Sequence, residues 1–457
     1  MALRRLISGT VWLSVVLSCA AVAAATADED LAGAPAANSH WPRLLGEQYT
    51  FVLQNQSTLH SPYAGPLSLD PKGDTQPTHT IGFYLGWALT DWAQLYVDTE
   101  KFMGAGVSSA TGLGGLTNGD VVREGASTLP KRFYIARSYL RFMLPLGPRL
   151  AQVAAAQDQI AGTEAQSRVE LKVGRLALND DFDKNSYAGG TRTAFMNWSL
   201  WDDTAWDYAA DTRGYTDGFM LAYISPLWSL KYGMYRMPTK ANGQELEASL
   251  ARARGDNLEL TVSPSKAAPV VRLLAYRNTA RMGDYREALA IAAAAGTPPN
   301  IVADDREGRT KYGFGINVEQ ALADDGASGV FLRLGWNDGR TESFAFSEVD
   351  RLASVGAQLA GVHWRRADDL FGAAVALDGL SGPHRDYLAA GGAGFLLGDG
   401  RLNYSHEEIL ELYYRLQLAW QWARVQLSPD FQYIKNPGYN AARGPVAFWG
   451  LRLHIEH

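Results

Sequence analysis

The sequence predicts an all-β fold, a transmembrane antiparallel up-and-down β-barrel of about 16 strands, and two observations carry this prediction. Large apolar residues stand at every second position of many segments, as at Ile81, Phe83, Leu85, Trp87 and Leu89. Residues two apart in a strand share a face, so such a segment has one apolar side and, at about nine residues, can cross the hydrocarbon layer when tilted. No internal stretch reaches the roughly 18 apolar residues of a membrane-spanning helix.

Composition agrees with this fold class but does not prove it. The chain of 457 residues contains 46 glycines, 21 tyrosines and 13 tryptophans. These numbers suit a membrane β-protein with aromatic girdles and glycine-rich loops, and they suit a large secreted β-protein equally well. The formal net charge is −6 and no basic run occurs, so nucleic acid is not an expected partner.

The N-terminal segment has the pattern of a secretory signal peptide. Arg4 and Arg5 precede the apolar residues 6–22, and Ala25-Thr26-Ala27 offers a small-residue cleavage site before Asp28. The sequence therefore predicts a signal peptide over 1–27, a short periplasmic segment over 28–40 and a barrel domain over 41–457. The only cysteine, Cys19, lies in the signal peptide, so no disulfide is expected in the processed chain. Val16 to Cys19 also weakly resembles a lipoprotein cleavage box.

Alternation along the chain defines the strands in order. Sixteen are expected, near residues 48–58, 80–89, 93–101, 132–144, 168–175, 214–224, 228–237, 257–262, 270–278, 311–321, 329–337, 346–361, 370–379, 408–418, 423–434 and 447–457.

The connections between these segments broadly alternate in length. Residues 90–92 and 225–227 read as tight turns, whereas long connections span 59–79, 102–131, 176–213, 238–256, 279–309 and 381–407. Short periplasmic turns and long extracellular loops are typical of outer-membrane barrels, and an even strand number puts both termini in the periplasm. The segment 145–167 falls on the short-turn side yet is long and rich in Ala and Gln. We expect a periplasmic excursion there, with helix as one option.

The barrel must be closed, because an unpaired backbone group in lipid costs several kcal/mol. A barrel of about sixteen strands is too wide for its side chains to fill and leaves an aqueous lumen. Such a lumen conducts small solutes unless it is plugged.

If the apolar faces meet lipid, the opposite faces line the lumen. Acidic, basic and aromatic side chains are mixed there, whereas a strongly ion-selective pore is expected to show mostly one sign. This mixture suits neutral polyols, because charged groups bind hydroxyls and rings cover apolar C–H faces. The alternative is that the charges only pair across the lumen and hydrate it. The candidate pathway residues on strands are Tyr96, Asp98, Glu100, Arg137, Tyr139, Arg141, Asn317, Glu319, Arg333, Asn337, Glu411 and Arg415.

Glycines on the inner face indicate close approach to the wall. They are Gly82, Gly86, Gly313, Gly315 and Gly335. A loop folded into the lumen would explain them, and the segments 102–131 and 176–213 are the candidates. In the second segment Trp198, Trp201, Trp206 and Asp207 alternate with further carboxylates, which favours a solute-contacting constriction. Packing of this segment on the barrel rim is the alternative.

The sequence gives little support for a metal site or a catalytic site. Asp181-x-Asp183-x-Asn185 begins like a calcium loop, but Ser186 replaces the required glycine and Arg192 the bidentate glutamate. Ser263 to Lys266 has the spacing of a serine nucleophile but lies in an expected turn beside a proline. No catalytic residue, metal or cofactor is expected.

Several segments together resemble the carbohydrate-selective outer-membrane porin family (OprB-like) of Gram-negative bacteria. They are His60-Ser61-Pro62-Tyr63-Ala64-Gly65, Phe195-Met196-Asn197-Trp198, residues 206–215, Lys311-Tyr312-Gly313-Phe314-Gly315, residues 335–342, residues 384–392, residues 398–404 and Asn436-Pro437-Gly438-Tyr439-Asn440. The resemblance implies a sixteen-stranded barrel, often trimeric, that passes mono- or disaccharides by diffusion. It does not fix the sugar. The terminal His457, where the family pattern has an aromatic residue, is a departure.

The sequence thus favours an outer-membrane porin for passive diffusion of carbohydrates, and not an enzyme. Expected partners are small carbohydrates, outer-membrane lipid and lipopolysaccharide, with a homotrimer or a monomer as the assembly. A general or ion-preferring diffusion porin is the main alternative, and a structural barrel with a sealed lumen is another.

Overall fold

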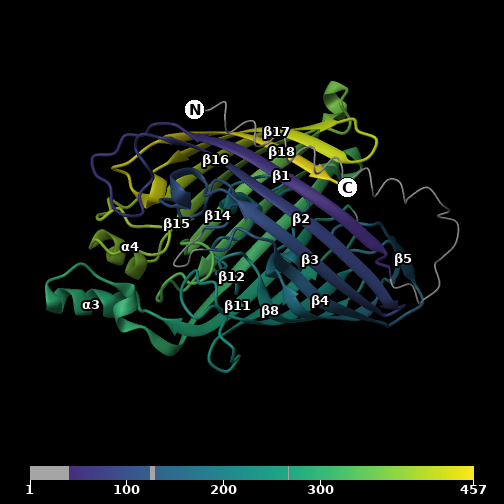
Figure 1. The fold of residues 1–457 in the computed structure, drawn as a ribbon, viewed down its shortest axis with the longest axis horizontal. Helices are drawn as coiled ribbons and strands as arrows, with labels where there is room; N and C mark the ends of the chain where they lie inside the picture. The colour runs from purple at the N-terminus through teal and green to yellow at the C-terminus, as the bar shows by residue number, and fades with distance from the viewer. Residues whose placement is uncertain (1–40, 124–128, 266) are drawn as a thin grey trace.

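The barrel is closed and antiparallel throughout. The structure is a computed structural model that describes residues 41–123, 129–265 and 267–457. Sixteen strands pair in sequence order around the barrel, and β1 pairs with β18 to close it (Figure 1). The expected signal peptide (1–27) and periplasmic segment (28–40) lie outside the described residues.

Each of the sixteen expected segments corresponds to one barrel strand. The strands are β1 (Leu44–Gln56), β2 (Asp74–Thr90), β3 (Ala93–Met103), β4 (Tyr134–Pro145), β7 (Arg168–Leu176), β8 (Thr216–Ile224), β9 (Trp228–Arg236), β10 (Arg254–Val262), β11 (Val270–Met282), β12 (Arg306–Ala323), β13 (Ser328–Asn337), β14 (Arg351–Ala360), β15 (Leu370–Gly379), β16 (Glu407–Leu418), β17 (Arg424–Lys435) and β18 (Val446–Glu456). Strand β2 begins six residues earlier than expected, and β14 begins five residues later, because the expected residues 346–350 belong to a loop that enters the lumen. Phe346 there stacks on Trp198 instead of pairing in the sheet.

The two faces of the wall differ as the alternation predicts. On β12, Ile316 is 41% exposed on the outer face, whereas Asn317 beside it is 2% exposed on the inner face. Trp92 and Trp228 lie at the short-turn end of the outer wall, and Trp336 and Trp449 lie near the other end. This apolar band between two aromatic belts is the surface that a bilayer requires.

Turns and loops are segregated to opposite ends of the barrel. Residues 91–92 join β2 to β3, and residues 324–327 join β12 to β13. Asp324 and Asp325 adopt positive φ in this second turn, a conformation that aspartate tolerates better than most residues. Long loops follow β1, β3, β7, β9, β11 and β15 at the extracellular end.

The segment 145–167 is a β-hairpin and not a helix, so the helical option is wrong. Strands β5 (Leu150–Val153) and β6 (Gly162–Ala165) pair separately from the barrel, at its short-turn end (Figure 1). Glu164 on β6 contacts Arg141 of the wall at 2.6 Å and Arg168 at 3.2 Å. These tertiary contacts override the helix preference of an Ala- and Gln-rich segment.

Among the described residues, helices occur only in the connections. In the described part of the chain they are α2 (Trp198–Trp201), α3 (Tyr285–Ala295) and α4 (Gly382–Ala389), with 3-10 turns at Val107–Ala110, Leu178–Asp180, Ile301–Asp304, Asp324–Gly326, Gly361–Trp364 and Pro437–Tyr439. Asp284 caps the N-terminus of α3 and Gly296 ends it in a left-handed conformation. Among the described residues, none of these helices has the length and apolar character needed to span a membrane.

Two loops fold into the lumen, and we call them the first inward loop (104–123) and the second inward loop (177–215). Both are largely buried in clusters that include Leu113, Phe195 and Leu200. A side chain at Gly315 or Gly335 would overlap the carboxylate of Asp203, so the second inward loop explains these two glycines. Gly82, Gly86 and Gly313 instead lie against side chains of the wall or of the hairpin.

Candidate functional site

The inward loops leave a cavity of about 460 Å³ inside the barrel. One wall is formed by β1 to β4, and the opposite wall by the second inward loop. The lining reaches from Asn242 and Phe346 in the extracellular loops to Gln157 and Arg424 at the periplasmic end. The cavity therefore extends along the barrel axis and offers a path for a solute.

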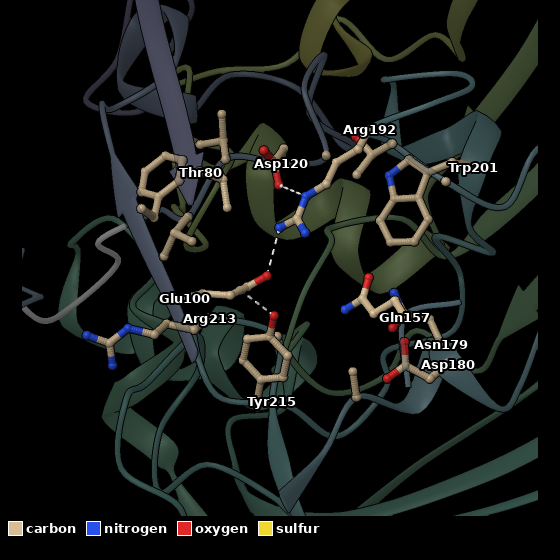
Figure 2. Close-up of a pocket in the computed structure, with 18 of the residues that line it drawn as sticks. Thr80, Glu100, Asp120, Gln157, Asn179, Asp180, Arg192, Trp201, Arg213 and Tyr215 are labelled. Carbon is tan, nitrogen blue, oxygen red and sulfur yellow. Dashed lines mark hydrogen bonds and ion pairs between the residues drawn. The ribbon is translucent and has the colours of Figure 1, made fainter. Parts of the chain in front are cut away.

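Arg192 of the second inward loop is the central cation of this cavity. Its guanidinium lies 2.9 Å from Glu100 on β3 and 2.8 Å from Asp120 on the first inward loop. Tyr215 and Tyr134 donate hydrogen bonds to the other oxygen of Glu100, at 2.5 and 3.1 Å. Figure 2 shows Glu100 and Tyr215 on one side of the cavity, facing Gln157, Asn179 and Asp180 on the other.

A second cation, Arg137 on β4, is surrounded by three carboxylates. Its distances to Asp180, Asp98 and Asp158 are 2.5, 3.2 and 3.3 Å. Burial alone would raise the pKa of Asp180, but the charge and hydrogen bond of Arg137 together with the charges of Lys184 and Lys172 lower the pKa below its ordinary value. Asp180 is thus ionised at neutral pH, and the cavity presents both signs of charge.

Aromatic rings form another part of the lining. Asn197 caps the short helix α2, which places Trp198 and Trp201 three residues apart, on neighbouring positions of one helical face. One face of Trp198 stacks on Phe346 with ring centroids 4.1 Å apart, and Tyr208 packs against Phe346 at 4.6 Å. Trp201 faces the cavity beside Arg192 (Figure 2), and its indole N–H has no hydrogen-bond partner in the described structure.

Of the sequence-predicted pathway residues, Glu100, Arg137, Trp198 and Trp201 line this cavity. The structure brings these four together from β3, β4 and α2, which are far apart in sequence.

Six other predicted residues contact the second inward loop instead. Arg333 donates to the carbonyl of Leu200 at 2.7 Å and lies 2.9 Å from Asp183. Glu411 accepts the backbone N–H groups of Met196 and Asn197 at 2.6 and 2.9 Å. The same loop receives hydrogen bonds from Asn317, Asn337 and Arg415 and donates one to Glu319. These side chains hold the loop against β12, β13 and β16.

The remaining predicted residues lie away from the cavity surface. Tyr96 stacks on Tyr139 at 5.3 Å, and Asp98 and Arg141 lie in the same part of the wall, against the hairpin. Trp206 donates to Asn257 at 2.9 Å. Asp207 accepts the backbone N–H groups of Phe344 and Ala345 at 2.8 and 2.7 Å.

Several lining residues were not among the sequence-predicted ones. They include Asp120, Gln157, Asp180, Lys184, Arg192 and Tyr215. Arg192 could have been predicted from the sequence as a cavity-lining residue, because it is one of few basic residues in a loop rich in aspartate and tryptophan. Gln157 could not have been predicted in this way, since nothing in its local sequence indicates that a periplasmic hairpin turns back into the barrel.

A family model for the carbohydrate-selective porins of the OprB family matches residues 89–457. The chain belongs to this family. The match covers most of the chain: it begins at the end of β2 and includes the fourteen barrel strands that follow. It agrees with the closed barrel and with an outer-membrane location.

One solved structure supports the fold. OprB of Pseudomonas putida in its high-pH form aligns over 91% of this chain and 94% of its own, with 14% identity and a TM-score of 0.63. The channel DcaP of Acinetobacter baumannii aligns over 91% of this chain and 96% of its own, with 9% identity and a TM-score of 0.47. A comparison with curated proteins gives no match.

Proposed function

We propose that this porin passes mono- and disaccharides by passive diffusion along the cavity between β1–β4 and the second inward loop. The observation that carries the proposal is the lining itself, in which ion-paired arginines and carboxylates stand close to the indole rings of Trp198 and Trp201. At about 460 Å³ the cavity lies in the size range of small-molecule sites, about 300–1,000 Å³.

The chemistry of the lining fits a sugar better than an ion. Arg192 and Glu100 neutralise each other, so neither attracts a free ion strongly, yet both keep donor and acceptor positions for hydroxyl groups. Trp201 offers an apolar face for the C–H groups of a pyranose ring. A sugar can therefore exchange its hydration water for protein contacts at little net free-energy cost, which permits both entry and release.

In this proposal the predicted pathway residues divide into two roles. Glu100, Arg137, Trp198 and Trp201 contact the solute. Tyr96, Asp98, Tyr139, Arg141, Trp206, Asp207, Asn317, Glu319, Arg333, Asn337, Glu411 and Arg415 position the loops and the hairpin that shape the path. The chain acts as a channel without catalysis or a cofactor.

The outer face of the barrel determines which membrane lipids the protein contacts. We infer that the apolar band meets outer-membrane lipid and that its extracellular half meets lipopolysaccharide. The assembly is a homotrimer or a monomer, and the mass of the purified protein in native mass spectrometry distinguishes the two.

Liposome swelling tests the proposed function. Purified protein is reconstituted, and swelling rates are compared for monosaccharides, disaccharides and amino acids of graded size. We expect monosaccharides to enter faster than amino acids of similar size. Rates that follow size alone would instead establish a general diffusion porin, and absence of both salt conductance and sugar entry would establish a sealed barrel.

A further inference from the structure

The tip of the β5–β6 hairpin turns back into the periplasmic mouth of the barrel. A second cavity, of about 570 Å³, lies at this mouth and is lined by the N-terminal end of β1, the β16–β17 turn and residues 155–157 of the tip. This vestibule and the main cavity share four lining residues, namely Ala156, Gln157, Arg424 and Glu456. These four residues therefore stand at the boundary between the lumen and the periplasmic exit.

The tip is fixed to the wall by contacts on both its flanks. The backbone N–H of Ile160 donates to the Tyr96 hydroxyl at 3.2 Å, and the Ile160 side chain is only 6% exposed. Asp158 lies 3.3 Å from Arg137, and Gln157 donates to Asp98 at 3.3 Å. The hairpin base is held by the contact of Glu164 with Arg141 at 2.6 Å. A tip with this many wall contacts is a fixed part of the channel and not a loose turn.

The groups at this boundary repeat the chemistry of the main cavity. Arg424 and Glu456 form an ion pair at 3.5 Å, which supplies donors and acceptors with no net charge. Gln157 adds an amide, and Figure 2 shows its side chain on the cavity side, next to Asn179 and Asp180. Trp420 and Trp422 line the vestibule just beyond and are more than half exposed.

We propose that Gln157, Arg424 and Glu456 form a second carbohydrate filter, at the periplasmic exit and in series with the loop constriction. This inference rests on the proposed function and extends it to a site that the hairpin creates. A sugar leaving the main cavity exchanges its contacts with Arg192 and Glu100 for the amide and the ion pair, then meets the indole rings of the vestibule. The width between the hairpin tip and β17–β18 sets the size that can leave.

A single cysteine tests the filter. Because Cys19 lies in the expected signal peptide, the Gln157→Cys variant carries one thiol once processed, which mass spectrometry verifies. The thiol is labelled with an uncharged reagent of about monosaccharide size. Gln152→Cys is the matched control, because Gln152 lies on the same hairpin but lines neither cavity.

We expect labelling of Gln157→Cys to lower disaccharide swelling rates several-fold and monosaccharide rates less, whereas labelled Gln152→Cys keeps the unlabelled rates. An independent variant, Gln157→Ala, should raise the disaccharide-to-monosaccharide ratio while changing salt conductance little. Unchanged rates after labelling, or an equal loss in both cysteine variants, would overturn the filter. If the wild-type protein shows no preference for sugars, the proposed function fails; if it does but position 157 has no effect, only the filter fails.

Discussion

At the scale of single residues, one residue type serves two purposes in this lumen. Glu100 faces the cavity and forms an ion pair with Arg192 at 2.9 Å. Both carboxylate oxygens of Glu411 instead accept hydrogen bonds from backbone N–H groups of the second inward loop. Both lie on inner faces of strands. What separates them is whether a loop covers the carboxylate, so in the proposed path the solute meets only Glu100.

Replacement of Glu100 by Gln should weaken sugar passage without unfolding the barrel. The amide keeps the shape but leaves Arg192 with Asp120 as its remaining charged partner. We expect monosaccharide swelling rates to fall by about fivefold, the equivalent of one hydrogen bond of about 1 kcal/mol. The reversal potential in a salt gradient should also move toward anion preference. Glu408→Gln on the outer wall is the control, and an equal effect there would argue against a role in the path.

Replacement of Trp201 by Ala should remove the apolar contact for the sugar ring. We expect a loss of about fivefold in monosaccharide flux, since a buried ring contact contributes about 1 kcal/mol. Salt conductance should stay equal or increase, because the cavity widens. Trp449→Ala removes an indole from the outer face and serves as the control. A parallel fall of salt and sugar flux in Trp201→Ala would indicate collapse of the loop instead.

The sequence predicted the inward orientation of the strand residues but not their division into solute-facing and loop-facing groups. Alternation is a local property, and it places Glu100 and Glu411 on the same side of the wall. Which of them is covered depends on where residues 177–215 come to lie, and that is set by contacts between segments some 130 to 260 residues apart, such as those of Arg333 and Arg452.

At the scale of elements, we propose that the second inward loop sets the width of the path. Arg333 is fully buried and joins Asp183 to the carbonyls of Ala188 and Leu200. It therefore organises three points of the loop from one position on β13.

Replacement of Arg333 by Met should loosen this loop. Loss of the guanidinium leaves the buried carboxylate of Asp183 without its charged partner. Breaking a buried ion pair in this way typically lowers the free energy of unfolding by about 3–5 kcal/mol. We expect a lower thermal midpoint in detergent together with larger and noisier single-channel currents. The exposed Arg286 on α3 provides the control substitution. Quiet currents of wild-type size would show that the loop does not depend on Arg333.

We expect the docking of this loop to depend on pH through Asp203. Burial, followed by the charge of Asp183, raises the pKa of Asp203 from 3.8 to about 8. A carboxyl with a raised pKa in the folded state contributes stability at low pH that is lost as pH rises toward and through the folded value. The thermal midpoint of the wild type should therefore fall as the pH rises from about 4, the ordinary pKa, to about 8, the pKa in the folded state.

The variant Asp203→Asn isolates this effect, because the amide keeps the oxygen that accepts the backbone N–H of Ala205. We expect a smaller fall of the midpoint with rising pH than in the wild type. If the thermal midpoint falls equally with pH in both proteins, a group other than Asp203 is responsible for the pH dependence.

Elements outside the barrel were harder to predict than the strands. The hairpin of 150–165 was expected as an excursion with helix as an option, because its Ala- and Gln-rich sequence has no strong alternation. Its strand conformation follows from contacts of Glu164 with Arg141 and Arg168, which no local pattern reveals. The second inward loop was better predicted, since its tryptophans, aspartates and the facing glycines gave independent signals.

At the scale of the whole molecule, the channel results from closure of the sheet and from the contrast between its apolar outer face and its polar inner face. The sheet has no free edge because β1 pairs with β18, and its outer face carries an apolar band between aromatic belts. The second inward loop lines the cavity inside the barrel, and the hairpin tip lies at the periplasmic mouth. All sixteen strands could be predicted, because a lipid-facing wall imposes the same period on every strand.

The whole lining predicts weak ion selectivity. Among the described residues, six basic and four acidic side chains line the main cavity: Arg123, Arg137, Lys184, Arg192, Arg213 and Arg424 against Glu100, Asp120, Asp180 and Glu456. We expect a small anion preference in the reversal potential under a salt gradient, reduced further by salt screening. A strong preference for either sign would favour an ion-preferring porin.

Single-channel recording with added sugar tests the carbohydrate path most directly. Current through the wild-type channel is measured while a monosaccharide is titrated, with a polyethylene glycol of matching size as the reference solute. If Arg192, Glu100 and Trp201 bind the sugar in passage, the current falls in a saturable manner that Glu100→Gln and Trp201→Ala weaken. A fall that is linear, equal for both solutes and unchanged in the variants would contradict a carbohydrate path through this cavity.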